Sequence, residues 1–327
     1  MSDTPTENDL RAIRKAAKRA RKKKLAEFGL YTENPVYKDK TLKVAFCFSG
    51  QLRTWRKCIP TWKKLFKDLK DNYNVSNIDV FCHIWDHNTL QNGIAMTQFK
   101  DGVLIDPIDN SVVLPDSEIN EYINLLNPVS YKIDNIEVSK SIKQQTSNKG
   151  LIESQYSGKF VNSWMAPQLY SIMYAAHLKK MHEIKNEINY DLCIRMRNDL
   201  YLNEDFRADF SIEEMLQPAF NTIHSCHSGI DVSGPWFKRR LGDIFWYADS
   251  PTFDKLSDFY HWLPIFGTRA LGPDLAPEHI FYYYAKMFNI SINSKPIHYV
   301  TIARDADYAN YKKDAGLGPL GEHEILC

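Results

Sequence analysis

The segment 49–53 reads Ser-Gly-Gln-Leu-Arg and directly follows a short apolar run. Glycine lets a backbone approach a ligand closely, and the planar guanidinium of arginine can bind phosphate oxygens through two hydrogen bonds. In open α/β sheets, ligands gather beyond the carboxyl ends of strands. We therefore expect this segment to contact a diphosphate or nucleotide through Ser49, Gly50, Gln51 and Arg53. The alternative is a tight turn that carries a surface arginine.

A second group of charged residues lies at the end of another apolar run. Strand alternation would place Arg195 and Arg197 on one face, with Asp199 near the strand end. Two arginines inside an apolar strand are costly unless an anion meets them, so we expect both to contact a diphosphate. Asp199 could hold a divalent cation that neutralises this leaving group. The alternative is internal ion pairing with Asp191, Asp205 or another carboxylate.

Further candidates lie at the ends of other predicted elements. Asp86 ends a second apolar run, and we expect it to line the same site, whereas His83 within that run is expected to be a buried core residue. Asp243 and Glu278 are carboxylates that could act as general base toward an acceptor hydroxyl. Because Glu278 would lie in the first turn of a helix, where a carboxylate is stabilised and less basic, Asp243 is the preferred base.

The segments around these candidates alternate between strand and helix patterns. Nearly continuous apolar runs predict buried strands, and apolar residues at helical spacing predict helices. The predicted strands are 42–48, 78–85, 129–136, 190–197 and 243–248. The predicted helices are 60–69, with Pro60 near its start, 167–188, 250–262 and 277–288. This alternation predicts an α/β fold built from βαβ units.

Charge divides the chain into two parts. Residues 1–24 carry nine Lys/Arg and three Asp/Glu, whereas residues 25–327 carry 32 and 37, which makes the body mildly acidic. An acidic body argues against nucleic-acid binding as the main activity, while the basic arm could contact an anionic surface. We predict a basic extension over 1–41 and a single domain over 42–327, with an irregular insertion around 87–160.

Two features indicate the compartment. No run approaches the ~20 apolar residues of a membrane-spanning helix, and the amino terminus is polar. The six cysteines are scattered without a Cys-x-x-Cys pair, which is typical of free thiols in a reducing compartment. We therefore expect a soluble, cytoplasmic protein, with peripheral binding to a membrane surface through the basic arm as an addition. The oligomeric state is left open.

Four segments form an ordered set: SGQLRTW (49–55), DVFCHIWD (79–86), YDLCIRMRNDLYL (190–202) and APEHIFYYYAKMFNI (276–290). They carry the patterns Ser-Gly-Gln-x-Arg, Asp-Val-Phe-x-His-x-Trp-Asp and Ile-Arg-x-Arg-x-Asp. Over about residues 42–300 the chain resembles GT-A-type glycosyltransferase-like proteins of bacteria, large viruses and phages. The resemblance implies a GT-A-like, Rossmann-type mixed, mostly parallel sheet flanked by helices.

The resemblance also implies an activity: transfer of a hexosyl or pentosyl group from a nucleoside-diphosphate sugar to an acceptor hydroxyl of a glycan or glycoconjugate. Arg53 would match the donor-binding loop, and Asp199 the last acid of an Asp-x-Asp metal motif. This chain departs from that motif, because it has Arg197-Asn198-Asp199 with a single carboxylate. Dependence on Mn²⁺ or Mg²⁺ is therefore open, since Arg195 and Arg197 could supply part of the charge. For a viral member, the compartment would be the host cytoplasm.

Two other functions remain in view. A sulfotransferase or another nucleotide-dependent transferase would also need an anion site after a strand, but its first loop should be richer in Ser, Thr and Gly. A non-catalytic protein that binds carbohydrate or polyanions would explain the single carboxylate of the metal motif. Donor, acceptor and the stereochemistry of transfer are open.

Overall fold

The computed structural model describes residues 41–89, 98–100, 103–105, 111–148, 165–202, 211–227, 241–242, 244–266, 277–296 and 300–302. The chain divides into the units Met1–Thr41 and Leu42–Cys327, and every helix and strand reported below belongs to the second unit. The basic extension lies outside the described residues apart from Thr41. The expected extension and single domain therefore stay predictions.

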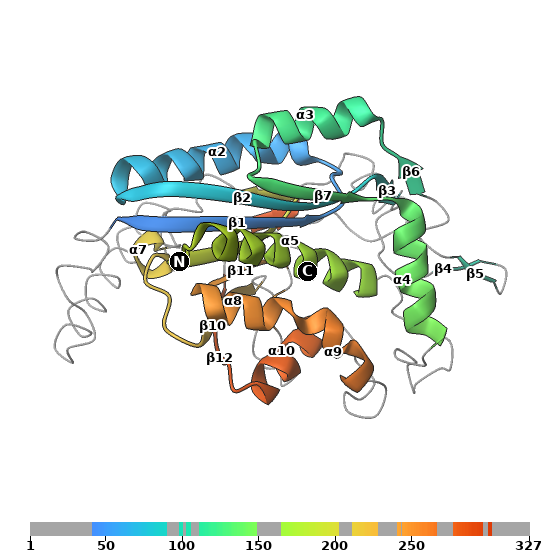
Figure 1. The fold of residues 1–327 in the computed structure, drawn as a ribbon. Helices are drawn as coiled ribbons and strands as arrows, with labels where there is room; N and C mark the ends of the chain where they lie inside the picture. Colours follow the sequence, from blue (N-terminus) through green and yellow to red (C-terminus); the bar gives the residue numbers. More distant parts are fainter. Residues whose placement is uncertain are drawn as a thin grey trace, which may run out of the picture. The chain divides into compact units, whose positions relative to one another are not determined.

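A seven-stranded mixed sheet forms the centre of the second unit, in the order β12-β10-β11-β8-β1-β2-β7 (Figure 1). The strands are β1 (Leu42–Gly50), β2 (Val75–Trp85), β7 (Ser130–Asp134), β8 (Leu192–Arg197), β10 (Thr222–His227), β11 (Phe245–Ala248) and β12 (Ser291–Pro296). Neighbouring strands run parallel except at β11, which is antiparallel to both β8 and β10. The expected α/β fold with a mixed, mostly parallel sheet is confirmed.

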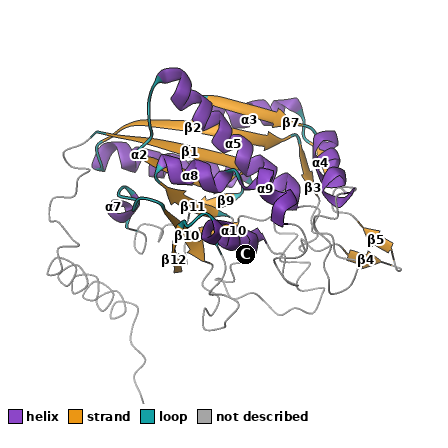
Figure 2. Ribbon diagram, turned by 60° about the horizontal axis from the view of Figure 1, so that its bottom comes forward, coloured by secondary structure: helices purple, strands orange, loops and turns teal. Residues whose placement is uncertain are grey.

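Helices cover both faces of the sheet (Figures 1 and 2). Helices α2 (Trp55–Asn72) and α3 (Asp116–Leu126) lie on one face, and α5 (Met165–Asn186) and α8 (Ser250–Ser257) lie on the other. The remaining helices are α4 (Ile136–Asn148), α7 (Ile212–Met215), α9 (Phe259–Phe266) and α10 (Pro277–Met287). Three strand pairs lie apart from the sheet: β3 (His87–Thr89) with β6 (Ser111–Val113), β4 (Gln98–Lys100) with β5 (Val103–Ile105), and β9 (Leu200–Leu202) with β13 (Val300–Ile302).

The central strand β1 is buried on both faces, as parallel strands between two helical layers must be. Phe46 and Phe48 face α2, where their rings lie 4.5 Å from those of Phe66 and Trp62. Cys47 points the other way, into a core cluster shared with α5 and α8. This double burial explains why the segment reads as an almost unbroken apolar run.

The order of the strands creates a topological switch point between β1 and β8. From β1 the chain passes through α2 to β2 and then on to β7, moving toward one edge of the sheet. It then crosses the opposite face as α5 and returns to pair β8 with the other side of β1. Ligands of open α/β sheets bind in the crevice that such a reversal leaves beyond the carboxyl ends of the strands.

Helix α2 begins five residues before the predicted start, at Trp55, so that Pro60 lies inside the helix. The buried residues Trp55, Cys58 and Ile59 continue the helical spacing upstream of the proline. Proline removes one backbone donor and disfavours a helix interior. Burial of this apolar face therefore outweighs the local cost of Pro60.

The region 87–160 is more regular than we expected, since it includes α3 and α4 besides β7, which corresponds to the strand predicted over 129–136. Helix α3 buries only Ile119, Tyr122 and Leu126. β7 leaves Tyr131 and Ile133 partly exposed at the edge of the sheet. The narrow apolar face of α3 gives a weak periodic signal, which explains why the sequence pattern missed this helix.

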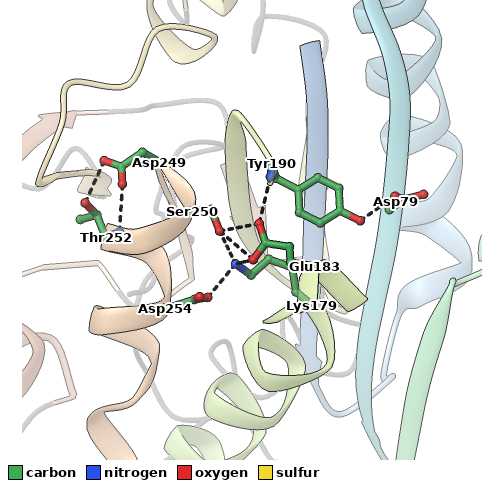
Figure 3. Close-up of polar contacts among 8 residues, drawn as sticks. All are labelled: Asp79, Lys179, Glu183, Tyr190, Asp249, Ser250, Thr252 and Asp254. Carbon is green, nitrogen blue, oxygen red and sulfur yellow. Dashed lines mark hydrogen bonds and ion pairs between the residues drawn. The ribbon is translucent and has the colours of Figure 1, made fainter. Parts of the chain in front are cut away.

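A buried ion cluster joins α5 to α8 (Figure 3). The fully buried Lys179 places its Nζ 2.7 Å from Glu183 Oε2 and 2.7 Å from Asp254 Oδ1, and it also donates a hydrogen bond to Ser250 Oγ. The Ser250 hydroxyl donates to Glu183 Oε1 at 2.7 Å, and the backbone N–H of Tyr190 donates to the same oxygen at 2.9 Å. The cluster thus satisfies its buried charges and fixes α5 against α8 and against the segment that enters β8.

A cleft of about 910 Å³ lies beside this cluster, between α5 and the segment 250–261. Glu183, Ser250 and Asp254 line it, together with His177 and His261. None of the residues that the sequence marks as site candidates lines this cleft. The candidate site described below is therefore distinct from it.

Replacing Lys179 by methionine should lower the free energy of unfolding by about 3–5 kcal/mol, because two buried carboxylates would lose their cation. The matched control is Lys180→Met on the exposed face of α5, which should change this free energy by less than about 0.5 kcal/mol. Urea denaturation followed by circular dichroism measures both. Equal stability of the two variants would contradict a stabilising role for the cluster.

Candidate anion-binding site

The two segments that carry the candidate arginines Arg53 and Arg197 meet at the switch point between β1 and β8. Arg53 follows the carboxyl end of β1, and Arg197 is the last residue of β8. The strands are adjacent and parallel, with Ser49 opposite Arg197 in the register. The carboxyl ends of both strands therefore lie at one edge, which brings residues 146 positions apart into contact.

Three charged side chains form the centre of the site. Arg53 Nη1 donates to Asp199 Oδ2 at 3.1 Å. Arg197 binds the same carboxylate through two bonds, from Nε to Oδ1 at 2.9 Å and from Nη2 to Oδ2 at 2.8 Å. We call Arg53, Arg197 and Asp199 the arginine–aspartate triad. It is the internal ion pairing that the sequence left open for Arg197, with Asp199 itself as the partner.

The triad presents positive charge to solution. The side chain of Asp199 is 2% exposed, whereas those of Arg53 and Arg197 are 21% and 20% exposed. Burial alone would raise the pKa of Asp199, but the two guanidinium groups reverse that effect and lower it to about 2. The carboxylate is therefore ionised at neutral pH, and the three groups sum to a net charge of +1. Within the triad, the arginine side chains are therefore the part that solution reaches, whereas the carboxylate is covered.

A hydrogen-bond chain holds the strand ends together. Asn198 Nδ2 donates to the carbonyl of Gly50 at 2.9 Å, and the buried hydroxyl of Tyr122 on α3 donates to Asn198 Oδ1 at 2.8 Å. Gly50 has φ +117°, a conformation that side chains rarely adopt, so glycine suits this turn. The chain thus links the turn after β1 to the end of β8 and to α3.

The backbone of Arg53 is itself unusual, with φ 39°. A non-glycine residue in the left-handed region costs on the order of 1 kcal/mol and persists only where its surroundings hold it. Here the N–H of Arg53 donates to Asn88 Oδ1 at 3.0 Å, and its side chain is held by Asp199. Such strain is often found where a side chain is positioned for a ligand.

The other donor-site candidates lie at different depths. Ser49 is buried next to the triad, and its Oγ makes no hydrogen bond with a described residue. Gln51 is partly exposed in the turn between Gly50 and Arg53. Arg195 lies deeper in β8, is 1% exposed and pairs in register with Cys47. Ser49 and Arg195 are thus both covered, and Gln51 is the partly exposed residue of the three; the donor-binding roles expected for them stay predictions.

The remaining candidates are not joined to the triad by any described contact. Asp86 follows β2, and its Oδ1 lies 3.1 Å from His87 Nδ1. Asp243 lies outside the described residues. Glu278 is the second residue of α10 and so lies in its first turn, as predicted. Its side chain is not among those that the structure describes. The roles expected for these three carboxylates stay predictions.

The metal role expected for Asp199 does not fit this geometry. Both carboxylate oxygens already accept hydrogen bonds from cationic groups, and Oδ2 accepts one from each arginine. A divalent cation on either oxygen would have to displace a guanidinium or lie against two positive charges. Within the described ranges, no group of three His, Cys, Asp or Glu side chains is arranged to hold a metal ion.

His83 is a satisfied core residue, as predicted. Its ring is fully buried, with Nδ1 2.8 Å from Ser171 Oγ and Nε2 3.0 Å from Asp134 Oδ2. The three residue types are those of a hydrolase triad, but the serine is 1% exposed and cannot meet a substrate. These contacts instead tie β2 to β7 and α5.

Three residues that contribute to the site were not predicted from the sequence: Asn198, Asn88 and Tyr122. Asn198 carried a usable signal, because a short amide between charged residues at a strand end commonly satisfies backbone groups of a turn. Asn88 and Tyr122 gave none, since they lie 35 and 76 residues from their partners in the site. Only the tertiary fold brings them there.

Comparison with known proteins gives one kind of likeness. No protein-family model and no curated protein sequence matches the chain. Among solved structures, a crystal structure of mouse xyloside xylosyltransferase 1 in its apo form is similar, with 10% sequence identity and a TM-score of 0.35. The match covers 78% of this chain and 84% of that one. A likeness of this size carries no conclusion about fold family or activity.

One finding bears on the expected location. None of the helices in the described part of the chain combines the length and apolar character needed to cross a membrane.

Acidification should destabilise the protein through its buried histidines. Burial lowers the pKa of His83 and of His87, although each ring also contacts a carboxylate. Below about pH 6.5 the unfolded chain therefore binds protons that the folded protein does not, and the free energy of unfolding falls. We expect the free energy of unfolding, measured by urea denaturation, to fall by about 1 kcal/mol between pH 7.5 and 5.5.

The variant His83→Gln should lose part of this pH dependence, whereas the control His177→Gln, on an exposed position of α5, should keep it. An unfolding free energy that rises on acidification, or an unchanged slope in His83→Gln, would contradict the assignment.

Proposed function

We propose that the chain is a glycosyltransferase that transfers a hexosyl or pentosyl group from a nucleoside-diphosphate sugar to an acceptor hydroxyl of a glycan or glycoconjugate. One observation supports this most: two arginines at the carboxyl ends of adjacent parallel strands converge at the switch point of the sheet, and both side chains are partly exposed while the carboxylate that they share is buried. A buried ion triad alone would explain the pairing of these groups. It would not call for the cationic side of the triad to face solution at the place where α/β folds bind ligands.

In the proposed reaction, the bond between the anomeric carbon and the β-phosphate oxygen breaks, and its electron pair leaves with the nucleoside diphosphate. The acceptor oxygen forms the new bond to the anomeric carbon and gives up its proton. Negative charge therefore grows on the diphosphate in the transition state, and fixed guanidinium groups facing it would lower the barrier. Arg53 and Arg197 are the residues that we assign to this task.

The other assignments follow from position. Ser49, Gly50 and Gln51 would hold the donor beside the triad, and Arg195 would add charge from beneath it. Asp243, with Glu278 as the alternative, would accept the proton of the acceptor hydroxyl. Asp86 would line the donor site from the end of β2.

The partners proposed are the nucleotide-sugar donor and the glycan acceptor, with no nucleic acid. The cytoplasmic location, and a peripheral contact of the basic arm with an anionic surface, also remain proposals from the sequence.

The test is a panel of nucleoside-diphosphate sugars incubated with the full chain, each with and without Mn²⁺, with release of nucleoside diphosphate as the readout. We expect turnover with at least one donor and none with a phosphosulfate donor. Arg53→Ala should reduce that turnover by about 100-fold, because it removes charge from the leaving-group side.

Arg56→Ala is the matched control. Arg56 lies three residues away in α2, with a side chain 51% exposed and paired to Glu118 and Glu121 on the surface. Its removal should leave turnover within about twofold of the parent. Equal activity of Arg53→Ala and Arg56→Ala would contradict the assigned site. Failure of every sugar donor, or transfer from the phosphosulfate, would contradict the proposed function.

A further inference from the structure

The geometry points to a donor site in which two guanidinium groups replace the divalent cation, and in which Asp199 is a positioning residue and not a metal ligand. We infer that nucleoside-diphosphate binding at this site does not depend on a cation held by Asp199. This inference rests on the proposed function, since it concerns the same diphosphate site.

Both oxygens of the Asp199 carboxylate are already occupied. Asp199 accepts three hydrogen bonds from the two arginines, at 2.8, 2.9 and 3.1 Å, and is 2% exposed. A carboxylate that serves a divalent cation offers oxygen atoms to the metal. Here those atoms face guanidinium groups, and the solvent-facing side of the triad belongs to Arg53 and Arg197.

A carboxylate and a divalent cation together give a site of net charge +1, and the triad reaches the same net charge with two guanidinium groups. Adding a divalent cation to the triad would raise its net charge to +3 at contact distances, where like charges repel strongly. The triad therefore already supplies the positive charge that a diphosphate requires.

Asp199 also holds both arginines in place. Arginine side chains are long and flexible, and binding a ligand with a flexible group costs the ordering of that group. Arg197 is held through a two-bond contact, and Arg53 is joined to the same carboxylate from the turn after β1. The residue after Asp199 is fixed in turn, because Trp62 Nε1 donates to the carbonyl of Leu200 at 2.7 Å. Asp199 thus orders both arginines before a ligand arrives.

The first experiment measures binding of UDP and of GDP to the full chain by calorimetry, in EDTA and in excess Mn²⁺ or Mg²⁺. We expect dissociation constants that agree within about threefold between these conditions. Binding that tightens tenfold or more with the metal, and loses that gain in Asp199→Asn, would show that Asp199 is a metal ligand and would overturn the inference.

The second experiment isolates the positioning role. Asp199→Asn keeps the shape of the side chain and removes its charge, and Asp71→Asn on an exposed ion pair of α2 is the matched control. In EDTA, Asp199→Asn should weaken nucleoside-diphosphate binding about tenfold while leaving binding of the bare nucleoside within about twofold. If Asp199→Asn weakens binding of the nucleoside diphosphate and of the nucleoside equally, the role of Asp199 is merely structural. If it binds the nucleoside diphosphate more tightly, Asp199 acts only as a counter-charge that competes with the ligand. Either result would overturn the positioning role.

The two proposals fail in different ways. Nucleoside-diphosphate binding that requires Mn²⁺ would end this inference and leave the glycosyltransferase proposal standing. No binding of any nucleoside diphosphate under any condition would end both. If Asp199→Asn does not fold, the comparison of EDTA with Mn²⁺ on the parent chain still decides the question of the metal.

Discussion

The contact of Arg53 and Arg197 with one buried carboxylate is the interaction on which the rest of the site depends. Like-charged groups do not share a small volume unless a counter-charge holds them, and Asp199 supplies it at 2.8–3.1 Å from both arginines. The burial of Asp199 is itself tolerated only because both arginines face it, which is why its pKa falls to about 2. Each member of the triad thus makes the others possible.

The fold makes this contact available through backbone geometry. Strands β1 and β8 must be adjacent, parallel and in register for their ends to meet, and the core on both faces of β1 fixes that arrangement. The turn at Gly50 and the amide of Asn198 then close the gap between the strand ends. Buried polar groups elsewhere, around Lys179 and His83, lock α5 to its neighbours. They are structural groups, whereas the triad keeps its charged side toward solution.

The sequence predicted more of the fold than of the site. Long apolar runs and strong helical spacing identified β1, β2, β8, α5 and α10, because burial on one or two faces leaves a periodic signal. The strand predicted over 129–136 corresponds to β7, whereas α3 was not predicted, since it buries only three side chains. The sequence also predicted that Arg53, Arg197 and Asp199 lie in one site, because the carboxyl ends of parallel strands share an edge of the sheet. It could not show that Asp199 binds the arginines, because a carboxylate near arginines and a carboxylate near a metal look alike in sequence.

The central claim is that Arg53 and Arg197 act on one anion as a unit. A double-mutant cycle tests it most directly, with Arg53→Lys, Arg197→Lys and the double variant compared for nucleoside-diphosphate binding by calorimetry. Lysine keeps the charge but loses the planar two-bond geometry. We predict that the loss of binding free energy in the double variant differs from the sum of the two single losses by about 1 kcal/mol or more. Such non-additivity is expected for groups in one network. Losses that add within about 0.3 kcal/mol, or no loss in either single variant, would contradict the claim.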